Sequence, residues 1–342
     1  MPVIEMDLRY PFPEPTIGCP QRVADGVELL RMPLPFALNH INLWLLSDAD
    51  GWALVDTGMA TNACRNAWEP ILQSYGAERL KTILVTHFHP DHVGLAGWLH
   101  QRSGAQVCMS AEEAATARRI YAAADAEHGR LIADFLGLHG LSPEQGAEVR
   151  RRGNKYRPAV SELPEKVATR RGDDTIRLGG RDWQLISVSG HSPEHLCAYD
   201  PEAGVLIAGD QVLPRITSNV SVGPNLPEAD PLREFLESLG RLRDLPAGTL
   251  VLPSHGLPFV GLRERIDAII GHHAERLALL RETCRRPCTA AELLPTLFRR
   301  PLDSHTLFFA MGEAIAHLHY LWHAGEADRQ LGADRIYRFS IS

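Results

Sequence analysis

The sequence predicts an α+β fold in which two β-sheets pack face to face between outer helices, followed by a small helical domain. Short apolar runs recur in two blocks along the chain, and helical patterns and turn residues bound each block. After Gly256 the strand patterns give way to longer helical periodicities, which predict the second domain. A chain of 342 residues is long enough for one large domain and a small appendage.

The first block of apolar runs lies in the N-terminal quarter of the chain. Its expected strands are 27–30, 41–46, 52–55 and 82–85, with a helix over 62–74. The third strand is followed by Asp56, and the fourth by Thr86 and His87. Polar residues directly after the carboxyl ends of buried strands are where layered α/β folds place their chemistry, so this sheet edge is a candidate site.

A helix-favouring, Ala-rich segment from Ala111 to about Glu165 separates the two blocks and predicts an insertion of two or three helices. The second block has expected strands at 175–178, 183–188, 196–199, 205–208 and 249–252, and a helix near 231–244. Helices follow over 262–284, 290–298 and 304 to about 324, and then two strand-like pieces at 327–331 and 335–340. Three helices and a β-ribbon outline a winged-helix module. We therefore expect one domain over 1–260, with its insertion at about 111–165, and a second over 261–342.

Composition and charge exclude several classes of protein. The chain is 44% hydrophobic and 23% charged, which argues against a fibrous or intrinsically disordered protein. A net charge of -7 works against broad binding to nucleic acid, although the basic stretch 150–157 leaves a local groove open. The six cysteines form no Cys-x-x-Cys pair and are expected to be reduced. With no apolar run of about 18 residues and no signal-peptide pattern, we expect a cytoplasmic protein without membrane contact.

Histidine is the unusual residue, because the chain has sixteen and several are clustered. Residues 86–94, at the end of an expected strand, contain His87, His89, Asp91 and His92. Imidazole nitrogen and carboxylate oxygen are ligands that zinc and iron(II) accept, and an i, i+2 pair on an extended segment points both rings to one side. Asp91 and His92 lie where the chain turns into a helix, so they can face a second metal ion beside one bound by His87 and His89.

Three further candidates each follow an expected strand and a small residue. They are His191, Asp210 and His255. One such residue alone is more often a helix cap or a satisfied polar group. Together with the first cluster, the three become candidate metal ligands.

These residues resemble the sequence landmarks of the metallo-β-lactamase superfamily of hydrolases. Five landmarks match in order: Asp56 within 54–58, the block His87, His89, Asp91 and His92, then His191 after Gly190, Asp210 after Gly209, and His255 before Gly256. The resemblance covers about residues 25–260 and implies a four-layer αββα sandwich. It also implies one divalent metal held by His87, His89 and His191, and a second held by Asp91, His92 and His255, with Asp210 bridging.

Two departures from the family pattern remove no ligand. Ser192 stands where Thr is commoner, and Ser254 where Gly is commoner. The region after His255 is similar to the C-terminal winged-helix extension of a glyoxalase-II-like branch. The Lys, Tyr and Arg pattern that holds glutathione in true glyoxalase II is not found, so that substrate is not implied.

The ligand set implies hydrolysis by a metal-bridging hydroxide. Two divalent ions about 3.5–4 Å apart share a water and lower its pKa from near 16 to roughly 7, so no Ser or Cys nucleophile is needed. We predict Asp91 and Asp56 as catalytic residues. Asp91 would steer the proton, and Asp56 would accept a hydrogen bond from a ligand imidazole or, equally, cap the turn at Thr57. Zinc is expected, although iron and manganese accept the same ligands.

The metal ligands do not determine which bond of the substrate is hydrolysed. The leading hypothesis is an activated acyl substrate, a thioester or lactone, and the alternative is a phosphodiester, including RNA, which the winged helix and stretch 150–157 favour. His40 and Tyr156 are predicted substrate contacts, and the inserted helices a wall of the pocket. We expect a small-molecule substrate and a homodimer. Weaker metal candidates, for which packing is the plainer interpretation, are Cys284, Cys288, His272, His273, His317, His319 and His323.

Overall fold

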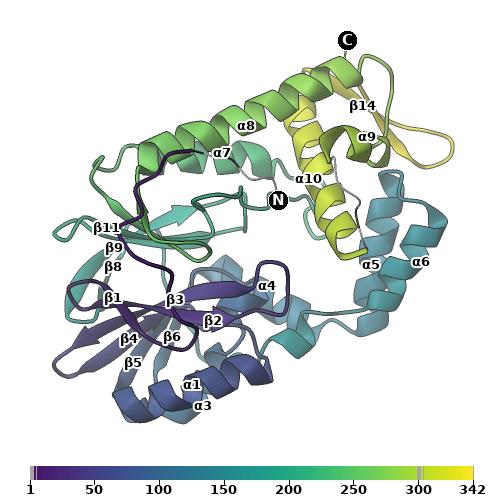
Figure 1. Cartoon of the computed structure of the whole chain (residues 1–342). Coiled ribbons are helices and arrows are strands. Elements are labelled where there is room, and N and C mark those ends of the chain that lie inside the picture. The colour runs from purple at the N-terminus through teal and green to yellow at the C-terminus, as the bar shows by residue number, and fades with distance from the viewer. Residues whose placement is uncertain (1–3, 5, 299–301, 303, 342) are drawn as a thin grey trace.

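Two stacked β-sheets form the centre of the computed structural model, which describes residues 4, 6–298, 302 and 304–341 (Figure 1). Within these residues, the first sheet has seven strands in chain order: β1 Gln21–Ala24, β2 Val27–Pro33, β3 His40–Asp48, β4 Gly51–Val55, β5 Leu80–Leu84, β6 Gln106–Met109 and β7 Ala168–Thr169. The second has six, in the order β13 Phe259–Val260, β12 Leu250–Pro253, β11 Val205–Gly209, β10 His195–Asp200, β9 Arg181–Val188 and β8 Thr175–Leu178.

Strand β3 shows how the sequence produces two buried sheet faces. Ile41, Leu43 and Leu45 pack into the core beneath the outer helices, whereas Trp44 and Leu46 pack between the sheets. Since side chains alternate across a strand, a strand covered on both faces needs an unbroken apolar run rather than an alternating one. This is why the run at 41–46 was recognisable as a strand.

Helices cover the outer face of each sheet, which confirms the predicted αββα sandwich (Figure 1). Helices α1 (Asn62–Tyr75) and α3 (Ala96–Ser103) lie below the first sheet, and α7 (Pro231–Arg243) and α8 (Leu262–Thr283) lie above the second. Thr61 caps α1 by accepting a hydrogen bond from the Cys64 N–H. Trp68 in α1 is fully buried, and its Nε1 donates to the Thr57 carbonyl, which ties α1 to the end of β4.

The predicted insertion consists of α4 (Ala111–Ala122), α5 (Asp125–Leu138) and α6 (Pro143–Arg152). A capping box at Ser142 and Gln145 starts α6. The end of α5 packs against the C-terminal region, where the His139 carbonyl accepts the Ala291 N–H at 3.2 Å. The insertion therefore joins the large domain to the small one.

The C-terminal region continues from α8 through α9 (Ala290–Leu297) and α10 (Ser304–His323) to a two-stranded ribbon, β14 (Ala327–Leu331) and β15 (Tyr337–Ile341). This is the expected order of helices and strands, and a small C-terminal domain is present. Its assignment as a winged helix stays a prediction. None of the helices in the described residues combines the length and apolar character of a membrane span.

Strand direction gathers the polar strand ends at one edge. Strands β4 and β5 run parallel, so their carboxyl ends, which precede Asp56 and His87, meet. In the second sheet β9 and β12 both run in the direction of β11, so the segments bearing His191, Asp210 and His255 also meet.

Two short 3₁₀ turns, η1 (Ala77–Arg79) and η2 (Arg157–Ala159), and the one-turn helix α2 (Pro90–Val93) complete the described elements.

Candidate metal centre

Seven predicted ligands converge between the carboxyl ends of the two sheets, in two groups whose ligand atoms lie within 4.8 Å of one another. The first group is His87, His89, His191 and Asp210, and the second is Asp91, His92 and His255. His87 and His89 follow β5, while Asp91 and His92 belong to α2. These are the seven residues that the resemblance implied as ligands, and Asp210, which was expected to bridge, falls within the first group by this distance.

The nitrogen atoms of the first group point at one another. His87 Nε2 lies 2.8 Å from His89 Nδ1 and 3.2 Å from His191 Nε2. Burial and neighbouring imidazoles lower the pKa of His89 to about 3 and hold that of His87 well below its usual value. Neutral imidazoles whose lone pairs converge form the donor set that a divalent cation requires.

Bonds on the outer side of each ring fix which nitrogen faces inward. His191 Nδ1 donates to the Asn219 carbonyl, and His255 Nδ1 donates to the His40 carbonyl, both at 2.8 Å. His92 Nδ1 lies 2.8 Å from Asp56 Oδ2. Each of these three rings therefore turns its Nε2 toward the centre, as is typical of metal-binding histidines.

Asp210 lies between the two groups. Its Oδ1 is 3.5 Å from His92 Nε2 and 3.4 Å from His255 Nε2, and its Oδ2 is 3.5 Å from His191 Nε2. Burial lowers the pKa of His255, but the carboxylates of Asp210 and Asp91 outweigh burial and raise it to about 10. The carboxylates of the second group therefore favour positive charge there. Asp210 faces both groups.

Asp56, buried in the turn after β4, holds His92 from behind. Its backbone has φ 61°, and its carboxylate also accepts hydrogen bonds from the Thr86 N–H at 2.8 Å and from the Thr86 hydroxyl. It therefore touches a ligand imidazole rather than the centre itself. Thr57, whose turn Asp56 was alternatively expected to cap, donates its hydroxyl to the His92 carbonyl at 2.6 Å.

Asn42 and Arg31 fix the turn that carries His255. Both are buried, and Asn42 Nδ2 donates at 2.9 Å to the Pro253 and Gly256 carbonyls. Arg31 Nη2 donates to the Gly256 carbonyl at 2.7 Å. The sequence analysis did not single out Arg31.

Two more residues beside the site escaped the sequence analysis. His195 is buried with its ring centre 4.9 Å from that of His87, and its Nε2 accepts the Asp210 N–H at 3.2 Å. Glu113, from the first turn of α4, is fully buried and accepts three hydrogen bonds from the loops that carry the histidines. His195 was detectable, since it lies four residues after His191, whereas Glu113 resembles any other Glu in an Ala-rich helix.

The two predicted substrate contacts lie beside the centre. His40 is half-buried with its ring centre 6.3 Å from that of His255, and its Nε2 accepts the Gly256 N–H at 3.0 Å. Burial, with Arg31 and His255 nearby, lowers the pKa of His40 to about 4, so its ring is neutral at pH 7. Tyr156 is buried and donates its hydroxyl to the Phe88 carbonyl at 2.7 Å. Both polar groups are therefore engaged in holding the ligand loops.

The weaker metal candidates lie elsewhere and join no metal-binding group among the described residues. His273 and His317 pair within the C-terminal region, Nδ1 to Nε2, at 3.1 Å. His319 and His323 bond to backbone carbonyls of the segment before α7. Packing, the plainer interpretation, accounts for these positions.

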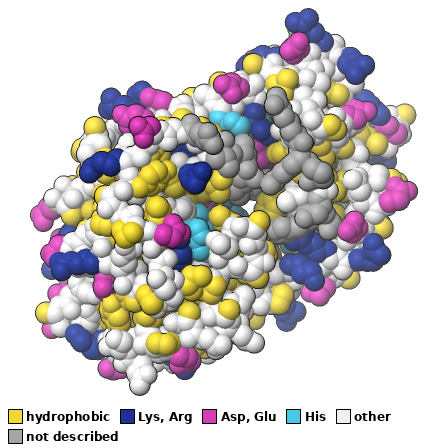
Figure 2. All heavy atoms as spheres, in the orientation of Figure 1, with side chains coloured by type: hydrophobic (Ala, Val, Ile, Leu, Met, Phe, Trp, Pro, Cys, Tyr) yellow, Lys and Arg dark blue, Asp and Glu magenta, His cyan; other side chains and the backbone are white. Residues whose placement is uncertain are grey.

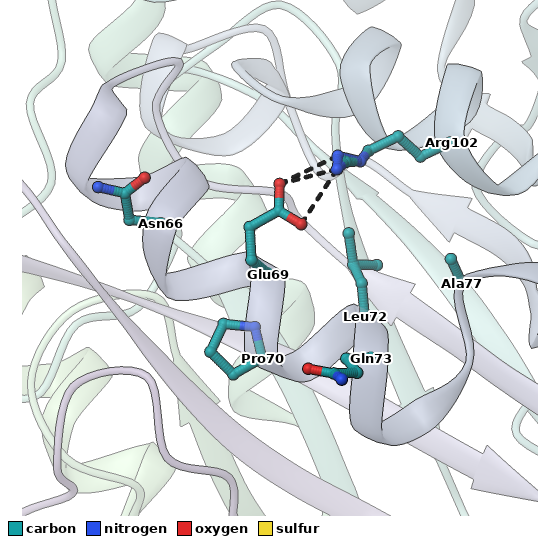
Figure 3. A pocket seen from close by; sticks show the side chains of 7 residues that line it. All are labelled: Asn66, Glu69, Pro70, Leu72, Gln73, Ala77 and Arg102. Atoms are coloured by element: carbon teal, nitrogen blue, oxygen red, sulfur yellow. Dashed lines mark hydrogen bonds and ion pairs between the residues drawn. The ribbon is translucent and has the colours of Figure 1, made fainter.

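Histidine side chains are visible near the middle of the face drawn in Figure 2. A separate depression on the outer side of α1 and α3 (Figure 3) contains none of the predicted site residues. Two of its lining residues, Glu69 and Arg102, form an ion pair at 2.8 Å.

A protein-family model described as the metallo-beta-lactamase superfamily matches residues 38–255, which contain every residue of the two groups. The chain belongs to the metallo-beta-lactamase superfamily. A second model, the metallo-beta-lactamase-like C-terminal domain, matches residues 277–342. The expectation of a metal-dependent hydrolase with a His and Asp centre for divalent metal is therefore confirmed.

Solved structures agree over nearly the whole chain. The chain is 42% identical to a beta-lactamase domain protein from Burkholderia ambifaria, with a TM-score of 0.91 and 98% of each chain covered. It is 33% identical to a metallo-beta-lactamase family protein from Thermus thermophilus, with a TM-score of 0.77 and coverage of 93% of this chain and 99% of that one. The similarity therefore includes the C-terminal domain.

Curated relatives are more distant and have diverse names. A probable metallo-hydrolase of Bacillus subtilis is 23% identical, covering 87% of this chain and 92% of the relative. A hydroxyacylglutathione hydrolase of Ectopseudomonas mendocina is 26% identical, covering 73% and 74%. An atrochrysone carboxyl ACP thioesterase of Aspergillus fumigatus is 23% identical, covering 81% and 75%.

Proposed function

We propose that this protein hydrolyses an activated acyl compound, a thioester or a lactone, with two divalent metal ions. The position of Asp210 carries the dinuclear part of the proposal, since its two carboxylate oxygens face the two groups of ligands. In this proposal His87, His89 and His191 hold one ion, Asp91, His92 and His255 hold the other, and Asp210 bridges them. Residues 1–260 form the catalytic domain and 261–342 the small one.

The donor atoms fit this assignment. His92 Nε2 and Asp210 Oδ1 are buried and have no hydrogen-bond partner in the protein. A buried polar atom without a partner costs about 1–3 kcal/mol, and more if it is charged. A cation held by His92, His255 and Asp210 would remove that cost for both atoms, and the mixed nitrogen and oxygen donors suit zinc, iron and manganese alike.

When bound, the metal ions polarise the substrate oxygen and make hydroxide available at neutral pH. The residues around the metal ions keep the ligands in position and accept the proton of the attacking water. Asp91 is more exposed than Asp210, at 21% against 11% of the side chain, and its Oδ2 lies 3.4 Å from His255 Nε2. We assign to this carboxylate the proton that water loses on attacking the acyl carbon, and its return to the leaving thiolate or alkoxide.

Two named relatives support the substrate class. The hydroxyacylglutathione hydrolase and the ACP thioesterase act, by their names, on acyl compounds, and this chain is 26% and 23% identical to them. Phe36, in the loop between β2 and β3 that leads into His40, is 45% exposed and is compatible with contact to an acyl group. Within the basic stretch 150–157, which favoured the phosphodiester alternative, Arg150 is paired with Asp134 at 2.7 Å.

The test is a hydrolysis assay of metal-reconstituted protein on a thioester, a lactone and a bis-aryl phosphodiester. His89→Ala serves as the blank, and His323→Ala, which removes an exposed histidine of α10, is the matched control. We expect thioester or lactone turnover that His89→Ala abolishes and His323→Ala retains. Turnover of the phosphodiester alone would refute the acyl proposal.

A further inference from the structure

Glu113 joins the two loops that carry the first group of ligands. Its Oε2 accepts the N–H of Phe88, the residue between His87 and His89, at 2.8 Å. Its Oε1 accepts the Ser192 hydroxyl and the Glu194 N–H, both at 2.7 Å, just after His191. One carboxylate thus spans a loop from the first sheet and a loop from the second.

We propose that Glu113 is a positioning residue that holds the metal site of His87, His89 and His191, and not the site of Asp91, His92 and His255. The inference rests on the proposed dinuclear function. Its contacts are confined to the backbone and hydroxyl groups beside the first group. The second group has separate supports, Asp56 behind His92 and Asn42 beneath the turn of His255.

The chemistry of a carboxylate explains why no other side chain serves here. Glu113 accepts three hydrogen bonds on two oxygens and donates none. A glutamine has the same shape but turns an NH₂ toward at least one of the two backbone N–H donors, because the Ser192 hydroxyl alone can reverse its role. Glu113→Gln therefore leaves one buried N–H without an acceptor while it preserves the packing of α4.

The experiment measures metal release from the fully loaded protein to a chromogenic chelator, together with metal stoichiometry. In Glu113→Gln we expect one of the two ions to leave roughly 10- to 100-fold faster while the other keeps its wild-type rate. Glu112→Gln is the matched control, since Glu112 is the exposed neighbour in the same helical turn. Asn42→Ala is the reciprocal variant and should accelerate release of the other ion.

The outcomes separate this inference from the proposed function. If wild-type protein binds fewer than two ions, the dinuclear proposal fails. If it binds two and Glu113→Gln changes neither release rate, or both equally, the positioning role is refuted. Ser192→Ala removes a single donor and should shift the same ion in the same direction by a smaller factor, so the inference stays testable if Glu113→Gln folds poorly.

A second, independent inference concerns Cys284 and Cys288 in the C-terminal domain. Both are buried, and their sulfur atoms lie 3.1 Å apart. Strand β15 holds both backbones: the Cys284 carbonyl accepts the Ile341 N–H at 2.8 Å, and Cys288 exchanges two hydrogen bonds with Phe339. A disulfide bond brings two sulfurs to about 2 Å, so a movement of roughly 1 Å closes it.

We propose that Cys284 and Cys288 react with low-molecular-weight disulfides and form a disulfide bond with each other. The Cys288 thiolate, on the less deeply buried residue, attacks such a disulfide and releases one small thiol. The Cys284 thiolate then attacks Cys288 sulfur and releases the second, so two thiols are oxidised and one small disulfide is reduced to two thiols. Among the described residues no third ligand joins the pair, which argues against a structural metal there.

The test is incubation of the intact protein with oxidised glutathione, alkylation under denaturing conditions and peptide mass analysis. We expect one peptide linked between 284 and 288, while Cys108 and Cys197, buried thiols outside the C-terminal domain, are alkylated. Alkylation of both Cys284 and Cys288, or a stable glutathione adduct on Cys288, would refute the proposal.

Discussion

Replacing Asp56 by Asn tests how far the centre depends on a residue that does not bind metal in our proposal. Asparagine keeps the size of the side chain and tolerates the left-handed backbone at φ 61°, so the substitution changes hydrogen bonding without adding strain. One carboxylate oxygen becomes an NH₂ group. With the remaining oxygen on the Thr86 N–H, that NH₂ faces the His92 Nδ1–H, which now lies 2.8 Å from Asp56 Oδ2.

The magnitude follows from the lost hydrogen bond. A hydrogen bond to a charged group contributes about 1.5–3 kcal/mol, and each 1.4 kcal/mol is about a factor of ten in an equilibrium constant. His92 escapes the clash of two donors by moving its proton to Nε2, the atom assigned to the metal. We therefore expect Asp56→Asn to weaken binding of the second ion by roughly 10- to 100-fold and to lower kcat/KM correspondingly.

The assay is competition between the protein and a chelator of known affinity, with each ion titrated separately. Asp48→Asn is the control, because Asp48 is exposed at the end of β3. The His87, His89 and His191 site should keep its affinity in Asp56→Asn. Wild-type affinity for both ions would refute the reasoning that Asp56 fixes the tautomer of His92.

Three further outcomes follow from the geometry. The pKa of His255 is raised to about 10, so its protonated form stabilises the metal-free protein fully below about pH 6.5, and this stability is lost as the pH rises toward 10. The Tm of the metal-free protein should therefore fall over that pH window in thermal unfolding. A Tm that does not change with pH would contradict this. Gly209→Ala places a methyl group 2.2 Å from His195 Nε2 at a backbone φ of +54°, so metal content measured by mass spectrometry should drop below that of wild type. Glu313→Ala leaves the buried guanidinium of Arg276, now 3.2 Å from that carboxylate, uncompensated, and denaturant unfolding should show a loss of about 3–5 kcal/mol.

The sequence predicted elements best where burial is continuous. The helix expected over 62–74 runs from Asn62 to Tyr75, and the strand expected over 205–208 runs from Val205 to Gly209. Strands β1 and β6 were not predicted. Both have four residues and begin with a glutamine, so neither shows enough of an apolar run to mark a strand. Their pairing with β2 and β5 is a property of the sheet rather than of the local sequence.

The ligands were predictable because their residue types are rare in such clusters, whereas of their supports only Asp56, behind His92, was singled out. Glu113 and Asn42 act through backbone groups far away in the sequence, and nothing in the neighbouring residues distinguishes them from exposed polar side chains. Tyr156 illustrates the converse. It was chosen as a substrate contact for its chemistry, and the structure shows its hydroxyl bonded to the Phe88 carbonyl, a contact no sequence pattern encodes.

These supports give the centre its rigidity from outside the ligand loops. Glu113 and Tyr156 hold the loop after β5 through the N–H and the carbonyl of Phe88, while Asn42 holds the turn after β12. Each support comes from an element other than the loop it fixes, so loosening the packing of α4 or β3 moves ligands without touching them. Metal affinity should therefore respond to substitutions in these elements as strongly as to changes in hydrogen bonding beside the histidines, because both act on the same few backbone groups.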